Sequence, residues 1–131
     1  PALSLDGSEY QALYGEPAGK PAPLDLQAEA ALLQGLWRAA PACSLVHDVS
    51  EGGLAVCLAE AGIASGIGAE LDLPDDPVTL FGEGGGQAVI ACAPDAVPEL
   101  GAPIRPIGSV GGDSLLGVRI DELRQAYEMS T

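Results

Sequence analysis

The residues best suited to chemistry lie in one short segment, His47-Asp48-Val49-Ser50-Glu51-Gly52-Gly53-Leu54. The Asp48 carboxylate can accept hydrogen bonds from N–H or OH groups of a ligand, or hold Mg²⁺. Gly52 and Gly53 each lower helix stability by about 1 kcal/mol relative to alanine, but they let a bound group approach the backbone closely. Because N–H groups at a helix start bind anions, the segment predicts a site for an anionic small molecule. The alternative is that the glycines only pack the helix against its neighbours.

The histidine and cysteine content limits the chemistry further. His47 is the only histidine, which excludes a metal site with several histidine ligands, and a lone histidine is more often structural than catalytic. The three cysteines are odd in number, widely spaced and set in apolar runs. They are therefore predicted to be buried, reduced thiols rather than disulfides or metal ligands. These residues are Cys43, Cys57 and Cys92.

A second glycine-rich segment is Phe81-Gly82-Glu83-Gly84-Gly85-Gly86. It must form a loop, because the interior of a helix or strand does not tolerate this density of glycine. The loop could wrap a phosphate, but it lacks the Lys-Ser/Thr ending of a P-loop, and the chain contains no G-x-G-x-x-G. A plain glycine-rich hairpin is the alternative. The weaker segment Ile107-Gly108-Ser109-Val110-Gly111-Gly112 is predicted to be a turn.

The elements that position these segments follow from residue periodicity and from turn residues. Residues 1–23 are rich in glycine and proline and are predicted to form a loop leading into the domain. Asp25 then caps a helix whose apolar residues share one face as far as Trp37, and Pro41 closes that helix. The chain opens on Pro1 without an initiator methionine, so we expect residues 1–131 to be a single domain of a longer polypeptide.

A strand, a polar turn and a helix then follow one another. Residues 43–46 form the predicted strand, Ser50 is the expected cap of the helix, and Gly62 is suited to end it. In α/β folds, ligands commonly bind where a strand leads into a helix. Further predicted elements are strands at 67–72, 87–93, 104–110 and 115–120, and helices at 76–80, at 94–100 and from Asp121 onward.

Strands and helices that alternate in this way define the expected fold class. Four or five strands with three or four helices predict an α+β domain in α/β/α layers, in which helices cover a mixed sheet of four to five strands. A hydrophobic content of 47% is too high for an acidic disordered tail, although the net charge is -14. The chain is therefore expected to fold around one core.

The charge balance and the apolar runs exclude several classes of partner. Nineteen acidic residues against five basic ones disfavour nucleic acid, whose binding depends on lysine and arginine. No apolar run approaches the roughly 20 residues that a bilayer-spanning helix needs, and the N-terminus lacks the pattern of a signal peptide. We therefore expect a cytoplasmic protein that binds neither nucleic acid nor membrane.

Four segments, in their order and spacing, resemble those of one known family. They are residues 5–10, 47–55, 80–83 and 107–112. Over nearly the whole chain they are similar to the C-terminal domain of phosphoribosylformylglycinamidine synthase, the synthetase subunit of purine biosynthesis. The His-Asp-x-Ser-x-Gly-Gly-Leu pattern is the specific one, since it separates this family from its superfamily relatives aminoimidazole ribonucleotide synthetase and selenophosphate synthetase.

The resemblance implies a ligase that uses ATP and Mg²⁺ to convert formylglycinamide ribonucleotide to the amidine. The ammonia would come from glutamine on a partner amidotransferase subunit. ATP and most Mg²⁺ ligands would belong to a preceding N-terminal domain of the same polypeptide, while this domain would form the substrate side of the cleft. We therefore expect the chain to be inactive alone.

The resemblance also assigns substrate contacts by position. They would come from a loop near the N-terminus, from the strand-to-helix turn and from the glycine-rich loop. The residues are Gly7, Ser8, His47, Asp48, Gly52, Gly53, Gly82 and Glu83. The chain departs from the family pattern at Asp6, where glycine is usual, and at Glu83-Gly84-Gly85-Gly86-Gln87, where Glu-Ser followed shortly by Gly-Arg is usual. The second departure removes a hydroxyl and a cation.

Two alternatives to this function stay open. The altered glycine-rich loop also suits a non-catalytic regulatory or assembly module. A superfamily relative that acts on another small phosphorylated acceptor would share the same segments.

Overall fold

The computed structural model describes residues 26–49, 51–84, 87–95 and 104–130. The predicted leading loop 1–23, the predicted caps Asp25 and Ser50, and most of the predicted helix 94–100 lie outside these residues. The helices are α2 (Leu26–Ala39), the 3-10 helix η1 (Ala40–Ala42), α3 (Gly53–Ser65), α4 (Pro77–Phe81) and α5 (Ile120–Ser130). The strands are β1 (Cys43–Asp48), β2 (Ala69–Leu71), β3 (Ala88–Cys92), β4 (Gly108–Val110), β5 (Ser114–Leu115) and β6 (Val118–Arg119).

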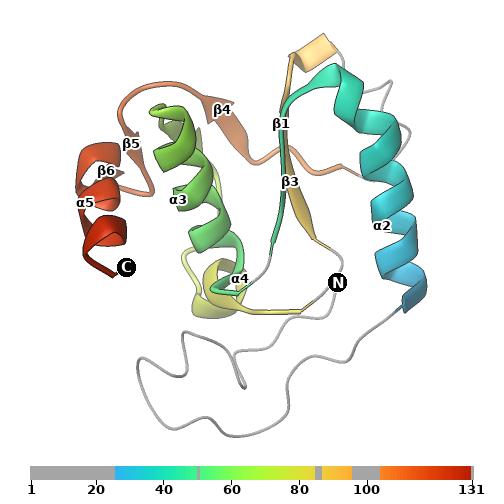
Figure 1. The fold of residues 1–131 in the computed structure, drawn as a ribbon, viewed down its shortest axis with the longest axis horizontal. Helices are drawn as coiled ribbons and strands as arrows, with labels where there is room; N and C mark the ends of the chain where they lie inside the picture. Colours follow the sequence, from blue (N-terminus) through green and yellow to red (C-terminus); the bar gives the residue numbers. More distant parts are fainter. Residues whose placement is uncertain (1–25, 50, 85–86, 96–103, 131) are drawn as a thin grey trace, which may run out of the picture.

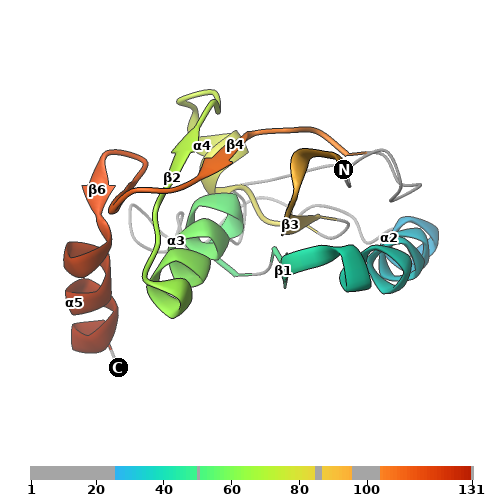
Figure 2. The same cartoon turned by 90° about the horizontal axis from the view of Figure 1, so that it is seen from above.

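Strands β1 and β3 form the central pair of the molecule. Both views place α2 on one side of this pair and α3 on the other, with α5 beyond α3 (Figures 1 and 2). The pair is antiparallel, and its register runs from Cys43 opposite Cys92 to Asp48 opposite Ala88. Since the chain reverses between the two strands, the end of β1 lies beside the start of β3. This geometry brings the glycine-rich loop that precedes β3 to the strand-to-helix turn.

The combination of helices and short sheets agrees with the predicted α+β class, but the single mixed sheet of four to five strands is not confirmed. Among the described residues the strands form three two-stranded antiparallel sheets, in which β1 pairs with β3, β2 with β4, and β5 with β6. A mixed sheet would contain parallel and antiparallel neighbours, whereas each of these pairs is antiparallel. Four of the six strands are only two or three residues long.

The predicted strand at 115–120 is wrong, because the chain turns back within it. Leu116 and Gly117 have φ values of 50° and 79°, and positive φ at both central residues is the pattern of a type I′ hairpin turn. The turn joins β5 to β6, and α5 begins immediately afterwards at Ile120. Asp121, the predicted cap, therefore lies in the first turn of α5, where its carboxylate accepts a hydrogen bond from the Glu122 N–H.

Helix α3 supplies four of the eight buried hydrophobic residues in the described part of the chain, namely Ala55, Cys57, Leu58 and Ala61. Leu58 of α3 forms the core cluster with Leu115 and Ile120. Gly62 does not end this helix as predicted, since the helix continues to Ser65 and Gly66 takes the left-handed conformation at its C-terminus. Gly62 instead faces Ile120, whose Cδ1 would lie 2.8 Å from an added Cβ. A small residue at this position lets α3 and α5 approach each other.

Helix α2 is less buried than its sequence pattern indicates. Leu33 and Trp37, two of the residues on its predicted apolar face, are 59% and 82% exposed. Within the described part of the chain, no helix has the length and apolar character needed to cross a membrane.

Candidate functional site

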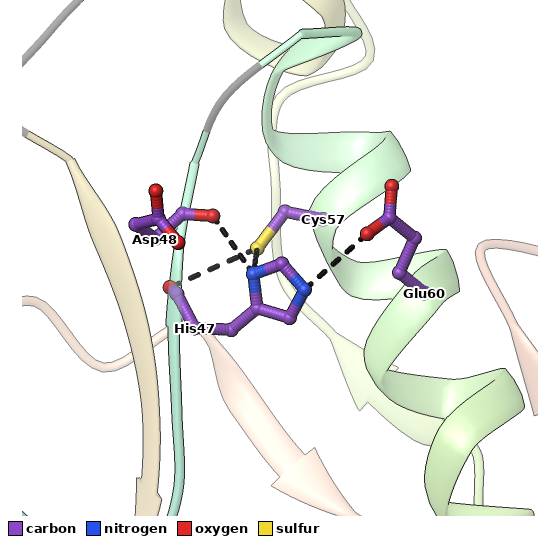
Figure 3. Close-up of polar contacts among 4 residues, drawn as sticks. All are labelled: His47, Asp48, Cys57 and Glu60. Carbon is purple, nitrogen blue, oxygen red and sulfur yellow. Dashed lines mark hydrogen bonds and ion pairs between the residues drawn. The ribbon is translucent and has the colours of Figure 1, made fainter.

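The end of strand β1 carries His47 and Asp48 on opposite faces. Burial alternates along the strand, with Cys43, Leu45 and His47 partly buried and the residues between them exposed. Figure 3 shows the His47 ring turned toward α3, while the Asp48 carboxylate lies on the other side of the strand. The period of two along a strand produces this separation, so two adjacent polar residues have different surroundings.

The His47 ring contacts helix α3 through two side chains. Its Nε2 lies 3.4 Å from Oε2 of Glu60, and its Nδ1 lies 3.4 Å from Sγ of Cys57 (Figure 3). Nδ1 also lies 2.8 Å from the main-chain oxygen of Asp48. The His47 side chain is 27% exposed and that of Glu60 is 42% exposed. His47 therefore joins the end of β1 to the middle of α3.

Cys57 is poorly suited to act as a nucleophile. Burial first, and then the nearby carboxylates of Glu60 and Asp48, together raise the pKa of its thiol to about 11. The thiol is thus protonated at neutral pH, and only the thiolate reacts readily. All three cysteines are free, and the prediction that they are buried is confirmed only for Cys57, because Cys43 and Cys92 are partly exposed.

Two consecutive glycines begin helix α3. Gly52 has φ 88° and Gly53 has φ 76°, values that other residues rarely adopt. A Cβ on Gly53 would lie 2.7 Å from the carbonyl carbon of Phe81, and one on Gly52 would lie 2.5 Å from Cγ2 of Val56. Both the backbone conformation and the available space therefore require glycine here. Gly52, rather than the predicted Ser50, is the N-cap residue.

The glycine-rich loop is attached to this helix start. Oε2 of Glu83 accepts a hydrogen bond of 3.0 Å from the Gly52 N–H. A carboxylate at this position also complements the positive end of the helix dipole. Nearby, the Val49 N–H donates to the main-chain oxygen of Gln87 at 3.1 Å, so the chain is attached to this region at Glu83 and again at Gln87.

This hydrogen bond bears on the predicted anion site. The Gly52 amide is satisfied by the protein's own carboxylate, and both glycines are buried. This geometry favours the alternative stated from the sequence, in which the glycines pack the helix against its neighbours. Among the described residues of this region, Asp48 and Glu51 are exposed.

Two of the four predicted segments, 47–55 and 80–83, therefore meet at one place in the fold. The end of β1, the start of α3 and the residues after α4 are joined by the contacts described above. They supply His47, Asp48, Gly52, Gly53, Gly82 and Glu83. Gly7 and Ser8 lie outside the described residues, and substrate contact by all eight stays a prediction. The weaker segment 107–112 contains β4, which pairs with β2 rather than with β1 or β3.

Reasoning from the sequence missed two partners of His47 and the role of Glu83 at α3. Cys57 and Glu60 are three residues apart on a helix, so they share a face, and that spacing could have signalled a common neighbour. A carboxylate capping a helix 31 positions away in the chain has no local signal.

A magnesium site is not complete within the described residues. They contain no group of three or more histidine, cysteine, aspartate or glutamate residues that could hold a metal ion. Asp48 alone could supply one oxygen ligand from the exposed face of β1.

Comparison with known proteins identifies the class to which this fold and site belong. Residues 4–121 match the family described as AIR synthase related protein, C-terminal domain. The match covers most of the chain, and the chain belongs to this family.

Individual relatives indicate which kind of enzyme within this family the chain is most similar to. The chain is 41% identical to phosphoribosylformylglycinamidine synthase subunit PurL of Thermobifida fusca over 96% of this chain and 19% of that protein. It is 42% identical to subunit PurL of Moorella thermoacetica over 89% of this chain and 18% of that protein. The chain thus spans about a fifth of the length of these curated relatives, and it corresponds to the C-terminal domain expected from the sequence resemblance.

Proposed function

We propose that the chain is the substrate-side C-terminal domain of a cytoplasmic, PurL-type phosphoribosylformylglycinamidine synthase. The observation that carries the proposal is the family match over residues 4–121, joined to PurL relatives along most of the chain. The meeting of segments 47–55 and 80–83 at the end of β1 supports it, because two of the four segments that carry the resemblance are neighbours in space.

In this proposal the exposed face at the end of β1 receives formylglycinamide ribonucleotide. The Asp48 carboxylate is exposed there and can accept hydrogen bonds from N–H or OH groups of the substrate. The bond between Glu83 and Gly52 holds the glycine-rich loop beside it. In this arrangement Glu83, Gly52 and Gly53 hold the start of α3 beside the exposed face of β1. His47 connects β1 to α3 through Cys57 and Glu60.

The remaining parts of the reaction would come from outside the described residues. Bound ATP and Mg²⁺ would activate the amide oxygen of the substrate, and they would be held mainly by a preceding N-terminal domain. A glutamine amidotransferase subunit would supply the ammonia. Holding the reactants between two lobes from which water is excluded suits phosphoryl transfer. The 131-residue chain alone would then form no amidine from ATP, ammonia and substrate.

A second candidate is a non-catalytic regulatory or assembly module. It is favoured by the glycine-rich loop, in which Glu83 is already bonded to Gly52 and the usual serine and arginine are replaced. A module of this kind would keep the fold and the surface without binding the substrate.

Calorimetric titration of the complete polypeptide that carries this domain separates the candidates. With formylglycinamide ribonucleotide as titrant, the synthase proposal expects saturable binding together with ATP-dependent amidine formation. Binding of another small phosphorylated acceptor in its place would indicate a superfamily relative with a different substrate. No binding of either ligand, by a protein that is folded, would favour the assembly module and contradict the proposal.

A further inference from the structure

Cys43 and Cys92 face each other at the end of the β1–β3 pair that is remote from Asp48. They are direct partners in the antiparallel register, whereas Asp48 pairs with Ala88 at the opposite end. Both thiols are free and partly exposed. The register shifts between Cys43 and Leu45, so this end of the ladder is irregular.

The separation of the two cysteines suits a disulfide. Directly opposed residues of an antiparallel pair have Cα atoms about 4.5 to 5.5 Å apart, and disulfides join Cα atoms about 4.4 to 6.8 Å apart. The Cys43 N–H donates to the Ala40 oxygen within its own segment. This hydrogen bond involves only the main chain of Cys43. Its side chain can therefore approach Cys92.

The two thiols also affect each other electrostatically. Burial raises the pKa of Cys43, and the charge of Cys92 and a side-chain hydrogen bond with Cys92 raise it further. This influence of Cys92 on Cys43 agrees with the direct pairing of the two residues in the strand register. Two partly exposed thiols on directly paired residues are the arrangement from which an intramolecular disulfide forms.

We propose that Cys43 and Cys92 form a reversible dithiol–disulfide site that exchanges with low-molecular-weight disulfides. The thiolate of one cysteine attacks a sulfur of the small disulfide, which releases one small thiolate and leaves a mixed disulfide. The second cysteine, as thiolate, attacks the protein sulfur of that mixed disulfide and releases the second small thiolate. The two protein thiols lose two protons and two electrons, and the small disulfide is reduced to two thiols.

Cys57 provides a comparison within the same chain. It is 3% exposed, and its thiol is protonated at neutral pH because burial raises its pKa to about 11. It should therefore remain unreacted under native conditions. The proposal rests on the pairing of the other two thiols and is independent of the proposed synthase function.

The disulfide would fix one end of the central strand pair. It would close the loop between positions 43 and 92, and cross-links of this kind restrict the unfolded chain. We expect the melting temperature of the oxidised chain to exceed that of the reduced chain by roughly 5 to 15 °C. The other end, with Asp48, would keep its arrangement.

The test uses the native 131-residue chain with oxidised glutathione as oxidant, followed by alkylation and peptide mass mapping. We expect two of the three thiols to be lost, no glutathione to remain attached, and one peptide linking Cys43 to Cys92. Dithiothreitol should restore both thiols. Glutathione retained on both cysteines without a cross-link, a link that includes Cys57, or links only between separate chains would each overturn the proposal.

Single variants make the test sharper. Cys43→Ser should retain one glutathione on Cys92, and Cys92→Ser should retain one on Cys43, because neither variant has the second thiol that releases it. Cys57→Ala should form the same cross-link as the unmodified sequence. If Cys57→Ala lost the cross-link while remaining folded, the pairing proposed here would be wrong.

Discussion

The two faces of β1 differ in what they contact, although their residues alternate along one short strand. On the face toward α3, His47 is held by Cys57 and Glu60. On the opposite face, Asp48 is exposed. The difference teaches that neighbouring residues of one motif can have opposite surroundings, one packed and one exposed, because successive side chains of a strand point to opposite faces. Under the proposed function, the exposed Asp48 binds the substrate and His47 supports the fold. The following predictions test that division, beginning with the largest expected effect.

The largest effect on stability is expected at Gly53, the first residue of α3. Gly53→Ala would place a side chain at φ 76° and 2.7 Å from the backbone of Phe81. We expect it to lower the free energy of unfolding by about 3 kcal/mol or more, measured by urea denaturation. Gly112→Ala is the matched control, because its φ is 78° but no atom lies within 4 Å of the added Cβ. Equal losses for the two variants would contradict the close packing between α3 and α4.

A smaller loss is expected at Glu83. Glu83→Ala removes the acceptor of the Gly52 N–H, and because that N–H is buried we expect a loss of about 1 to 3 kcal/mol in the free energy of unfolding. Glu51→Ala removes an exposed carboxylate close to the same helix start and should change stability by less than about 0.5 kcal/mol. If the two variants behaved alike in denaturation, Glu83 would not hold the loop to α3.

The smallest effect concerns the pH dependence of stability near Cys57. Its folded-state pKa of about 11 lies above the ordinary value of 9.0, so the buried neutral thiol contributes stability below pH 9 that is lost as pH rises toward 11. Cys57→Ser does not titrate in this range. Thermal melts between pH 8 and pH 11 should therefore show a steeper decline for the unmodified chain than for the variant. Parallel declines would mean that the thiol is not protected in the fold.

The local elements were predictable because their signals lie in adjacent residues. The β1 strand, the polar turn and the helix behind it follow from a short apolar run, a charged pair and helical spacing between Leu54 and Ala61. Asp76 and Pro77 likewise begin α4, where the Asp76 carboxylate accepts hydrogen bonds from the N–H groups of Val78 and Thr79.

What could not be predicted depends on contacts between distant parts of the chain. The pairing of β1 with β3 in antiparallel register has no local signal, and the same holds for the bond between Gly52 and Glu83. The hairpin at Leu116 was missed because a leucine at positive φ is uncommon. The segments of the site could be identified from the sequence. Which of their residues are packed, such as Gly53, and which are exposed, such as Asp48, could be seen only in the fold.

The most direct test of the central claim is Asp48→Asn in the complete polypeptide proposed above, compared with the exposed control Asp75→Asn. Steady-state kinetics of amidine formation and thermal melts would be measured on the same preparations. We predict that Asp48→Asn lowers kcat/KM for formylglycinamide ribonucleotide by roughly 10- to 100-fold, with a melting temperature within about 1 °C of the unmodified protein. An unchanged kcat/KM, or a loss of activity matched by an equal loss of stability, would contradict the claim that the exposed face of β1 receives the substrate.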